Sequence, residues 1–341
     1  MFALSTLLKT AKGLIPGLMV TALVAMAAAF LGSHYKGSML LFALLLGLAL
    51  HFVSEDKRCA AGIQFASTTV LRLGVALLGL RLTVDHVVKL GWQTALALLV
   101  GVALTIALGI VLAQFFKVER SLGVLIGGAT AICGASAALA IASVLPNNKN
   151  LERDTALTVV GVTTMSTIAM VIYPLITQWL SFSAVESGKF LGATIHDVAQ
   201  VVGAGFSLSV EAGDAATITK LIRVSFLVPT LLVITIVVRR HLTETDLENS
   251  DTNTPLLPWF LLVFLVFMLM NSAGIIASTV QSVASNMSQA FLVLAIAGVG
   301  LKTSLQSITQ LGWRPVAMIV LVTLGLAVMM GIYLLLTRET C

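Results

Sequence analysis

Long apolar runs separated by short polar breaks dominate this chain. A membrane-spanning helix needs about 20 predominantly apolar residues, and the runs between breaks give eleven candidate spans, or ten without the weak seventh. The candidates lie at residues 14–32, 38–54, 60–83, 91–116, 121–146, 154–181, 188–208, 216–238, 257–273, 276–301 and 312–336. The pattern therefore predicts an all-α integral membrane protein.

The one sizeable polar connection lies at residues 239–258, where acidic residues cluster and indicate a solvated cytoplasmic loop. Otherwise we expect a single polytopic membrane domain over residues 1–341. Its N-terminal half extends to about residue 181 and its C-terminal half begins at about residue 182.

Composition supports a membrane protein and excludes other classes. The 341 residues are 58% hydrophobic and 10% charged, with a mean hydropathy of +1.03, whereas soluble domains carry about 25% charged residues. The basic residues are scattered, so we expect no nucleic-acid partner. Cys59, Cys133 and Cys341 form neither a disulfide framework nor a metal-ligand spacing, and we expect no metal and no cofactor.

The distribution of lysine and arginine in the loops predicts orientation, because basic residues favour the cytoplasmic side. With the N-terminus in the cytoplasm, eleven basic residues lie inside and six outside. The inner set is Lys9, Lys12, Lys57, Arg58, Lys117, Arg120, Lys189, Arg239, Arg240, Lys302 and Arg314; the outer set is Lys36, Arg81, Lys89, Lys149, Arg153 and Arg338. We therefore predict a cytoplasmic N-terminus.

An internal repeat relates two parts of the chain. The motif at 78–81, Leu-Gly-Leu-Arg, leads to Leu-Gly-Trp at 90–92, and Val-Gly-Leu-Lys at 299–302 leads to Leu-Gly-Trp at 311–313. The offset between the copies is a constant 221 residues. The copies are seven predicted helices apart, and an odd separation predicts an inverted repeat, as in many secondary transporters.

Residues 127–142 are unusually rich in small side chains for a lipid-facing helix. Glycine weakens a helix, so Gly127, Gly128 and Gly134 favour a helix broken near the middle of the membrane, with Ser136 capping its second half. Freed N–H groups at a half-helix N-terminus bind anions. The alternative is a continuous helix that packs its small face against a neighbour.

Ionisable residues inside apolar segments are costly and are functional candidates. Arg72 lies near the middle of the third candidate span and needs an anion, a carboxylate or water. A structural ion pair is the alternative.

A polar cluster follows at residues 192–200, where His196 and Gln200 share a helix face and Asp197 can bind a proton or sodium. Gly192-Ala193-Thr194 repeats the Gly-Ala-Thr of residues 128–130, which favours a second broken helix. A re-entrant turn with satisfied polar groups is the alternative.

Lys220 and Arg223 share one face at the start of the eighth span. Either they line a site, or they reach the membrane surface as ordinary anchors. Buried positive charges would outnumber the buried acid Asp197, and that balance suits an anionic substrate.

Three motifs together are similar to a known family: Ala131 to Ala137, Gly192 to Val202, and Lys220 to Arg223. They resemble the signatures of the sulfate exporter family of YeiH-like proteins in the bacterial inner membrane. The resemblance covers most of the chain and implies an inner-membrane location and export of sulfate or a related sulfur oxyanion. By analogy, paired broken helices imply the crossed-helix architecture of sodium/proton antiporters and bile-acid symporters.

The leading hypothesis is a secondary transporter, not an enzyme, that exports a small anion by alternating access, coupled to protons or sodium. One alternative is a cation/proton antiporter that uses Asp197; another is an intramembrane hydrolase that uses Cys133 or Ser136 with His196. The lipid bilayer and a homodimer are the other expected partners. Under the leading hypothesis His196 and Asp197 couple ions, and the substrate-binding residues are Cys133, Gly134, Ala135, Ser136, Ala137, Arg72, Gln200, Lys220 and Arg223.

Overall fold

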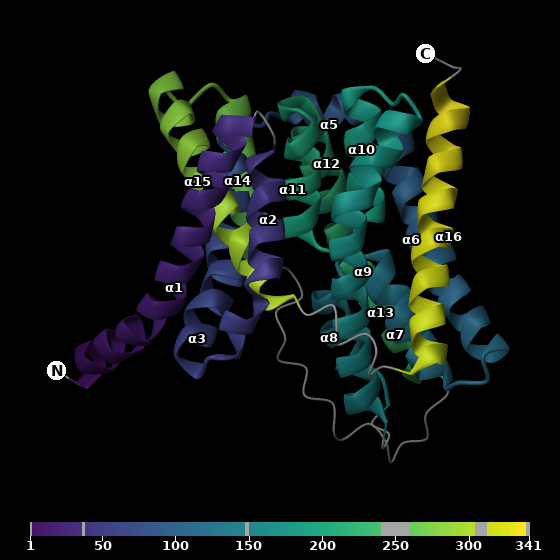
Figure 1. The fold of residues 1–341 in the computed structure, drawn as a ribbon. Coiled ribbons are helices and arrows are strands. Elements are labelled where there is room, and N and C mark those ends of the chain that lie inside the picture. Colours follow the sequence, from purple (N-terminus) through teal and green to yellow (C-terminus); the bar gives the residue numbers. More distant parts are fainter. Residues whose placement is uncertain (1, 36–37, 147–149, 240–258, 304–311, 339–341) are drawn as a thin grey trace. The chain divides into compact units, whose positions relative to one another are not determined.

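The computed structural model describes residues 2–35, 38–146, 150–239, 259–303 and 312–338, and its regular elements are all helices (Figure 1). In order they are α1 (Phe2–Tyr35), α2 (Met39–Ala49), η1 (His51–Glu55), α3 (Lys57–Phe65), η2 (Ala66–Val70), α4 (Leu71–Leu78), α5 (Val84–Leu90), α6 (Trp92–Phe115), α7 (Arg120–Ala131), α8 (Ala135–Ala142), α9 (Leu151–Trp179), α10 (Ala184–Thr194), α11 (Val198–Leu208), α12 (Val210–Ser225), α13 (Leu227–Arg239), α14 (Trp259–Ser272), α15 (Ser278–Lys302) and α16 (Trp313–Thr337). The all-α prediction is confirmed. Of the predicted loop 239–258, all but Arg239 lies outside the described residues.

Seven of the described helical stretches are long and apolar enough to cross a membrane, and α2, α11 and α14 are shorter apolar helices. Each of the eleven predicted spans coincides with helix. The apolar side chains that remain exposed, such as Leu104 and Val328, are those expected of a surface that faces lipid. The chain is therefore a multi-pass helical membrane protein.

Local signals in the sequence fix several helix ends. Ser183 and Glu186 form a reciprocal capping box at the start of α10. The Asp56 carboxylate accepts a hydrogen bond from the Arg58 amide, 2.9 Å, at the start of α3. Such caps satisfy N–H groups that the first helical turn leaves without intrahelical partners.

The chain forms two compact units, each built from segments of both halves of the sequence. Unit 1 comprises residues 1–89, 202–214 and 259–304, and unit 2 comprises residues 90–201, 215–258 and 305–341. Helix α15 is central to unit 1, where it packs against α1, α2, α3, η2 and α4. In unit 2, α7 packs against α6, α8, α9 and α16.

Glycines allow the helices of each unit to approach closely. In unit 1 an added Cβ on Gly47 would lie 2.9 Å from the Gly300 Cα, where α2 crosses α15. In unit 2 an added Cβ on Gly109 would lie 2.8 Å from the Gly127 Cα, where α6 meets α7. Close backbone contact at small residues is the usual way for membrane helices to associate.

The predicted inverted repeat is confirmed by the helices that its motifs join. In unit 2, the end of α6 meets the start of α16, where the Phe116 and Trp313 rings are 5.8 Å apart, so these packed helices are antiparallel (Figure 1). Gly91 and Gly312 begin the two helices with nearly the same backbone angles, φ 80° and ψ 146° against φ 77° and ψ 149°. Positive φ at that point explains why both copies have glycine.

The corresponding helices of unit 1 are antiparallel as well. Ser67 of η2 lies beside Gly298, whereas Gly74 of α4 accepts a hydrogen bond from Ser288, 2.7 Å. Residue numbers therefore increase along η2 and α4 in the direction in which they decrease along α15. Leu311, part of the second motif, lies outside the described residues.

The structure corrects the fifth predicted span, residues 121–146, which returns to the end where it starts instead of crossing the membrane. An added Cβ on Gly128 would lie 2.2 Å from the Ile141 Cδ1, so α8 folds back along α7 instead of continuing its course. The Asn150 side chain donates a hydrogen bond to Glu119, 2.7 Å, which brings the start of α9 to the start of α7. Helices α7 and α8 therefore form a re-entrant hairpin.

Two basic residues lie at the opposite ends of unit 2 from those that the orientation prediction gave them. Arg153, near the start of α9, lies at the same end of unit 2 as Arg120, and the prediction that they lie on opposite sides is wrong. Lys189 lies in α10, whose start meets the end of α16 through the Arg338–Glu186 pair, 3.8 Å, so it is at the other end. The two shifts cancel, because one basic residue joins the end that contains Arg120 and one leaves it, so the predicted excess of basic residues at that end is unchanged.

Candidate functional site

Two helix breaks lie in unit 2. Helix α7 ends at Ala131 and α8 begins at Ala135; helix α10 ends at Thr194 and α11 begins at Val198. The repeated Gly-Ala-Thr motif forms the last turn of α7 and of α10. Both predicted helix breaks are confirmed, and the match of three residues marks equivalent positions.

The two breaks lie against each other. An added Cβ on Gly134 would lie 3.6 Å from the His196 Cβ. Cys133, Gly134 and His196 are all buried. Four helix ends therefore come together: the C-termini of α7 and α10 and the N-termini of α8 and α11.

Gly134 forms the N-cap of α8 with φ 65° and ψ −125°, a conformation that residues with a side chain rarely adopt. The N-cap residue is a glycine without a side chain and Ser136 lies inside the helix, so the prediction that Ser136 caps it is wrong. Ser136 lies inside the first turn of α8 and is exposed, Ala135 is half-buried and Ala137 is buried. The first N–H groups of a helix have no intrahelical partner, so this end of α8 presents donors next to an accessible hydroxyl.

Arg223 of α12 binds the C-terminal ends of both broken helices. Its Nε and Nη2 donate to the carbonyls of Ala131 and Thr130 in α7. Its Nη1 donates to the carbonyl of Ile195, 3.3 Å, and more weakly to that of Gly192, 3.5 Å. One guanidinium thus joins the ends of α7 and α10.

Lys220, one turn earlier on α12, makes a second bridge. Its Nζ donates to the carbonyl of Ile132, 2.7 Å, and to that of Ile195, 2.9 Å. Lys220 is 0% and Arg223 1% exposed, so neither reaches the membrane surface as an anchor. Helix C-termini carry partial negative charge, which explains how these cations are tolerated inside the protein.

The second break is held by polar groups of α9. The Asp197 amide donates to Ser166 Oγ, 3.0 Å, and the Asp197 carboxylate accepts from the Ala199 amide, 2.8 Å. Asp197 therefore caps its own helix, α11, and it remains half-buried. Gln200 donates to Thr167 Oγ1, 2.8 Å, while its Oε1 has no hydrogen-bond partner within the described part of the chain.

His196 pairs with a residue far away in sequence. Its Nε2 lies 3.0 Å from Thr323 Oγ1 of α16, and both side chains are fully buried. Thr323 was missed because one threonine in an apolar run usually bonds to its own helix. Thr167 was missed for the same reason.

The structure brings together most of the predicted site residues but not all. Those in unit 2, gathered at the two breaks, are Cys133, Gly134, Ala135, Ser136, Ala137, His196, Asp197, Gln200, Lys220 and Arg223. Arg72 belongs to unit 1, where it lies in α4 directly after the π-helical turn η2, and its side chain is exposed. Its predicted role stays a prediction.

Unit 1 contains a charged pair that the sequence did not reveal. Arg81 Nη2 lies 2.5 Å from the Asp214 carboxylate, and the guanidinium lies 5.4 Å from the centre of the Phe206 ring. Within the described residues, no group of three histidine, cysteine or acidic side chains is arranged to hold a metal ion.

Comparisons with known proteins place the chain in a family. Residues 16–320 match the family model described as "Conserved hypothetical protein 698". The UPF0324 membrane protein CT0845 of Chlorobaculum tepidum is 45% identical over 318 residues, which cover 92% of this chain and 87% of the relative. The UPF0324 membrane protein RB0971 of Rhizobium meliloti is 47% identical, with coverage of 94% and 93%.

A third relative, the UPF0324 membrane protein TauZ of Paracoccus denitrificans, is 46% identical, with coverage of 93% of this chain and 94% of the relative. No solved structure shows a significant match. The extent of these matches agrees with the resemblance to YeiH-like membrane proteins. The chain therefore belongs to the UPF0324 family of membrane proteins.

Proposed function

We propose that this protein is a secondary transporter that exports a small anion by alternating access. The observation that carries the proposal is the uncapped start of α8, with exposed Ser136, placed beside two buried cations. Half-helix N-termini that point at anionic groups are how several transporters bind substrate within the membrane.

Charge at the two breaks supports an anion. Each helix terminus carries roughly half an elementary charge. The carbonyl ends of α7 and α10 therefore offset only about one of the two positive charges of Lys220 and Arg223. The N-termini of α8 and α11 add positive potential, and the Asp197 carboxylate lies at α11. A positive potential remains at α8, where the donors are accessible.

In this proposal the segment from Cys133 to Ala137 holds the anion through the first N–H groups of α8 and the Ser136 hydroxyl. Lys220 and Arg223 provide countercharge from behind the carbonyls that they bind. The Oε1 of Gln200, which has no partner among the residues that the structure describes, accepts a hydrogen bond from a protonated group or a water that accompanies the ligand.

The remaining assignments follow from the sequence. His196 and Asp197 couple transport to protons or sodium, and the assignment of Arg72 to substrate binding rests on its position in an apolar segment alone. We infer sulfate or an organosulfur anion as substrate from the resemblance to sulfate exporters. We also infer a bacterial inner-membrane location from the same resemblance, and a cytoplasmic N-terminus from the distribution of basic residues.

A cation/proton antiporter is the second candidate, favoured by one observation. Asp197 is half-buried at a helix break, and its backbone amide donates to the Ser166 hydroxyl. Carboxylates in such places bind sodium or protons in many transporters. Under this alternative, binding depends on sodium or pH and needs no anion.

Thermal unfolding of the purified protein in detergent tests the proposal, because a ligand that binds the folded state raises the melting temperature. We would titrate sulfate, sulfite, thiosulfate, taurine, chloride and sodium. Saturable stabilisation by one anion that Ser136→Ala weakens and Ser282→Ala leaves unchanged is the expected result; Ser282 is an exposed serine of α15 in unit 1. Stabilisation by sodium alone that Asp197→Asn removes would replace the proposal with the antiporter.

A further inference from the structure

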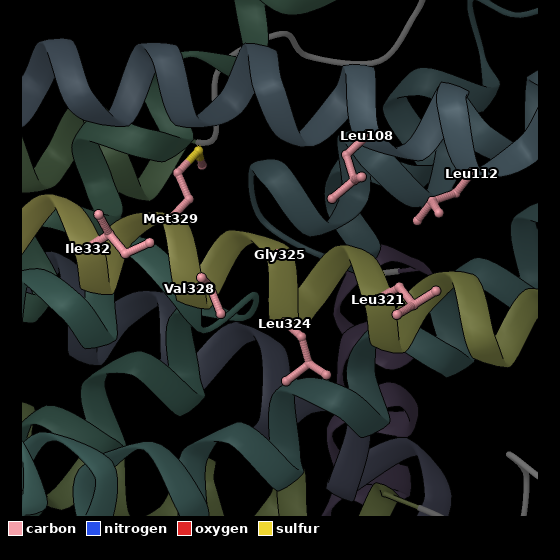
Figure 2. A pocket seen from close by; sticks show the side chains of 8 residues that line it. All are labelled: Leu108, Leu112, Leu321, Leu324, Gly325, Val328, Met329 and Ile332. Atoms are coloured by element: carbon pink, nitrogen blue, oxygen red, sulfur yellow. The ribbon is translucent and has the colours of Figure 1, made fainter.

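An apolar groove lies on unit 2 between α6 and α16, with a volume of about 620 Å³ (Figure 2). Its lining contains no charged side chain and consists of Leu108, Leu112, Leu321, Leu324, Gly325, Val328, Met329 and Ile332. The groove lies on a different face of α16 from Thr323, which meets His196 and is fully buried.

The groove exists because α16 has no side chain at its centre. Gly325 faces the gap between the helices, and an added Cβ would lie 2.6 Å from the Leu108 Cδ2 (Figure 2). Leu321, Leu324, Val328 and Ile332 around it are each at least 43% exposed, whereas the buried face of α16 is already packed. In a membrane protein such a surface meets lipid.

The groove continues along both helices to an aromatic and basic end. On α16, residues 314, 321, 325, 328 and 332 follow helical spacing along one stripe, so Arg314 extends the groove by two turns. On α6, residue 116 follows Leu108 and Leu112 at the same spacing. The Phe116 and Trp313 rings pack 5.8 Å apart at this end, as aromatic residues do at a membrane surface.

The charge at that end is positive. Lys117, Arg120 and Arg314 are exposed. Glu119, which lies between Lys117 and Arg120 in the sequence, accepts hydrogen bonds from the Asn150 and Ser121 side chains, and Asp154 of α9 at the same end is paired with Arg153. Basic residues at a membrane surface attract anionic lipid headgroups.

We propose that the groove between α6 and α16 binds one acyl chain of an anionic glycerophospholipid, whose phosphate is held by Arg314 and Lys117. The distance along α16 from Arg314 to Ile332 is about 27 Å at 1.5 Å per residue. That length accommodates a headgroup and one extended acyl chain. The proposal stands whether or not unit 2 transports an anion.

A second copy of the chain fits the groove less well. Copies in one membrane share the same orientation, so a symmetric contact through α16 brings the basic end of one copy to the same end of the other. Lys117, Arg120 and Arg314 would then repel their counterparts across the axis. An anionic lipid instead neutralises them.

Native mass spectrometry of the delipidated full-length protein tests the proposal with two probes, dioleoyl phosphatidylglycerol and dioleoyl phosphatidylcholine. We expect tighter binding of phosphatidylglycerol, and a loss of about fivefold in that preference in Arg314→Gln, since each surface cation contributes on the order of 1 kcal/mol toward an anionic bilayer. Arg58→Gln, an exposed arginine at the start of α3, is the matched control and keeps the preference.

Filling the groove provides an independent test. Val328 is 59% exposed, so Val328→Trp occupies the groove without a clash in the protein core, and we expect it to remove the tightest phosphatidylglycerol site. Leu336→Trp, on the same helix but outside the groove, keeps that site. Equal binding of the two lipids, an unchanged preference in Arg314→Gln, or full binding in Val328→Trp overturns the proposal. A dimer that Val328→Trp dissociates assigns the groove to a second copy and also overturns it.

Discussion

The two helix breaks of unit 2 are alike on one side and different on the other. Each is three residues long and follows a Gly-Ala-Thr turn. On the C-terminal side of both, Lys220 and Arg223 bind the last carbonyls. These shared contacts fix the ends of α7 and α10 to the same two cations.

The N-terminal sides differ in how their N–H groups are satisfied. At the second break the Asp197 carboxylate accepts from the Ala199 amide, so α11 carries its own cap. At the first break Gly134 provides no such acceptor, and Ser136 is exposed beside it. The first break therefore presents an exposed hydroxyl beside helix N–H donors, as the proposed anion site requires, while the second contains an internal carboxylate suited to a proton or cation.

The largest expected effect on stability comes from removing Arg223, which binds the C-terminal ends of both α7 and α10. Arg223→Ala leaves buried carbonyls at the ends of both helices without their donor, and each such loss costs about 1–3 kcal/mol. We expect the free energy of unfolding to fall by about 3 kcal/mol or more, measured by denaturation in detergent. Arg338→Ala removes only surface contacts at the end of α16 and should cost less than about 1 kcal/mol. Equal effects of the two variants would mean that the hydrogen bonds of Arg223 do not stabilise the breaks.

The second-largest effect on stability is expected from the backbone conformation, which differs between the two breaks. Gly134 has φ 65°, so Gly134→Ala should destabilise the protein by about 1–3 kcal/mol. Ile195, the first residue of the second break and the C-cap of α10, has ordinary angles of φ −70° and ψ 139°. We expect Ile195→Val to cost about 1 kcal/mol through lost packing alone. A smaller cost for Gly134→Ala than for Ile195→Val would contradict the strained first break.

Asp197 allows charge and capping to be separated at the second break. Asp197→Asn keeps an oxygen acceptor for the Ala199 amide, so we expect little change in melting temperature. Asp197→Ala removes the cap and should cost about 1 kcal/mol. Both variants remove the charge, so both should abolish the dependence of binding on sodium or pH. Retention of that dependence in Asp197→Asn would exclude Asp197 as the coupling group.

The smallest effect on stability is expected at Ser136. Because Ser136 caps nothing among the described residues, Ser136→Ala should change the free energy of unfolding by less than about 0.5 kcal/mol. Its effect on anion binding should be larger, a loss of about 1 kcal/mol or fivefold in affinity, measured by titration calorimetry. A stability loss without a change in affinity would remove Ser136 from the site.

Much of this arrangement could be predicted from local sequence. Glycine-rich turns weaken helices wherever they occur, so the two breaks followed from Gly128, Gly134 and Gly192. The repeat followed from motifs at a fixed offset, and Gly91 and Gly312 have the same backbone angles. These features depend on residues within a few positions of one another.

The remaining features depend on contacts between distant residues. The course of α8 is set by the packing of Ile141 on Gly128, which apolar periodicity does not reveal. The partners of Lys220 and Arg223 are backbone carbonyls, and a carbonyl has no signature in the sequence. Thr323 meets His196 across 127 residues. The sequence therefore identified Lys220, Arg223 and His196 as candidate residues but could not identify the groups that they contact.

The position of α12 in the chain has a consequence for how the protein is made. Lys220 follows its acceptors Ile132 and Ile195 by 88 and 25 residues, and Arg223 follows Thr130 by 93. Synthesis proceeds from the N-terminus, so the ribosome completes both acceptor ends before either cation leaves the exit tunnel. An unpaired lysine or arginine in lipid is costly. Because the acceptor carbonyls are synthesised first, each cation can bind them as soon as it enters the membrane. A circular permutant that begins with α12 would reverse the order and should insert poorly.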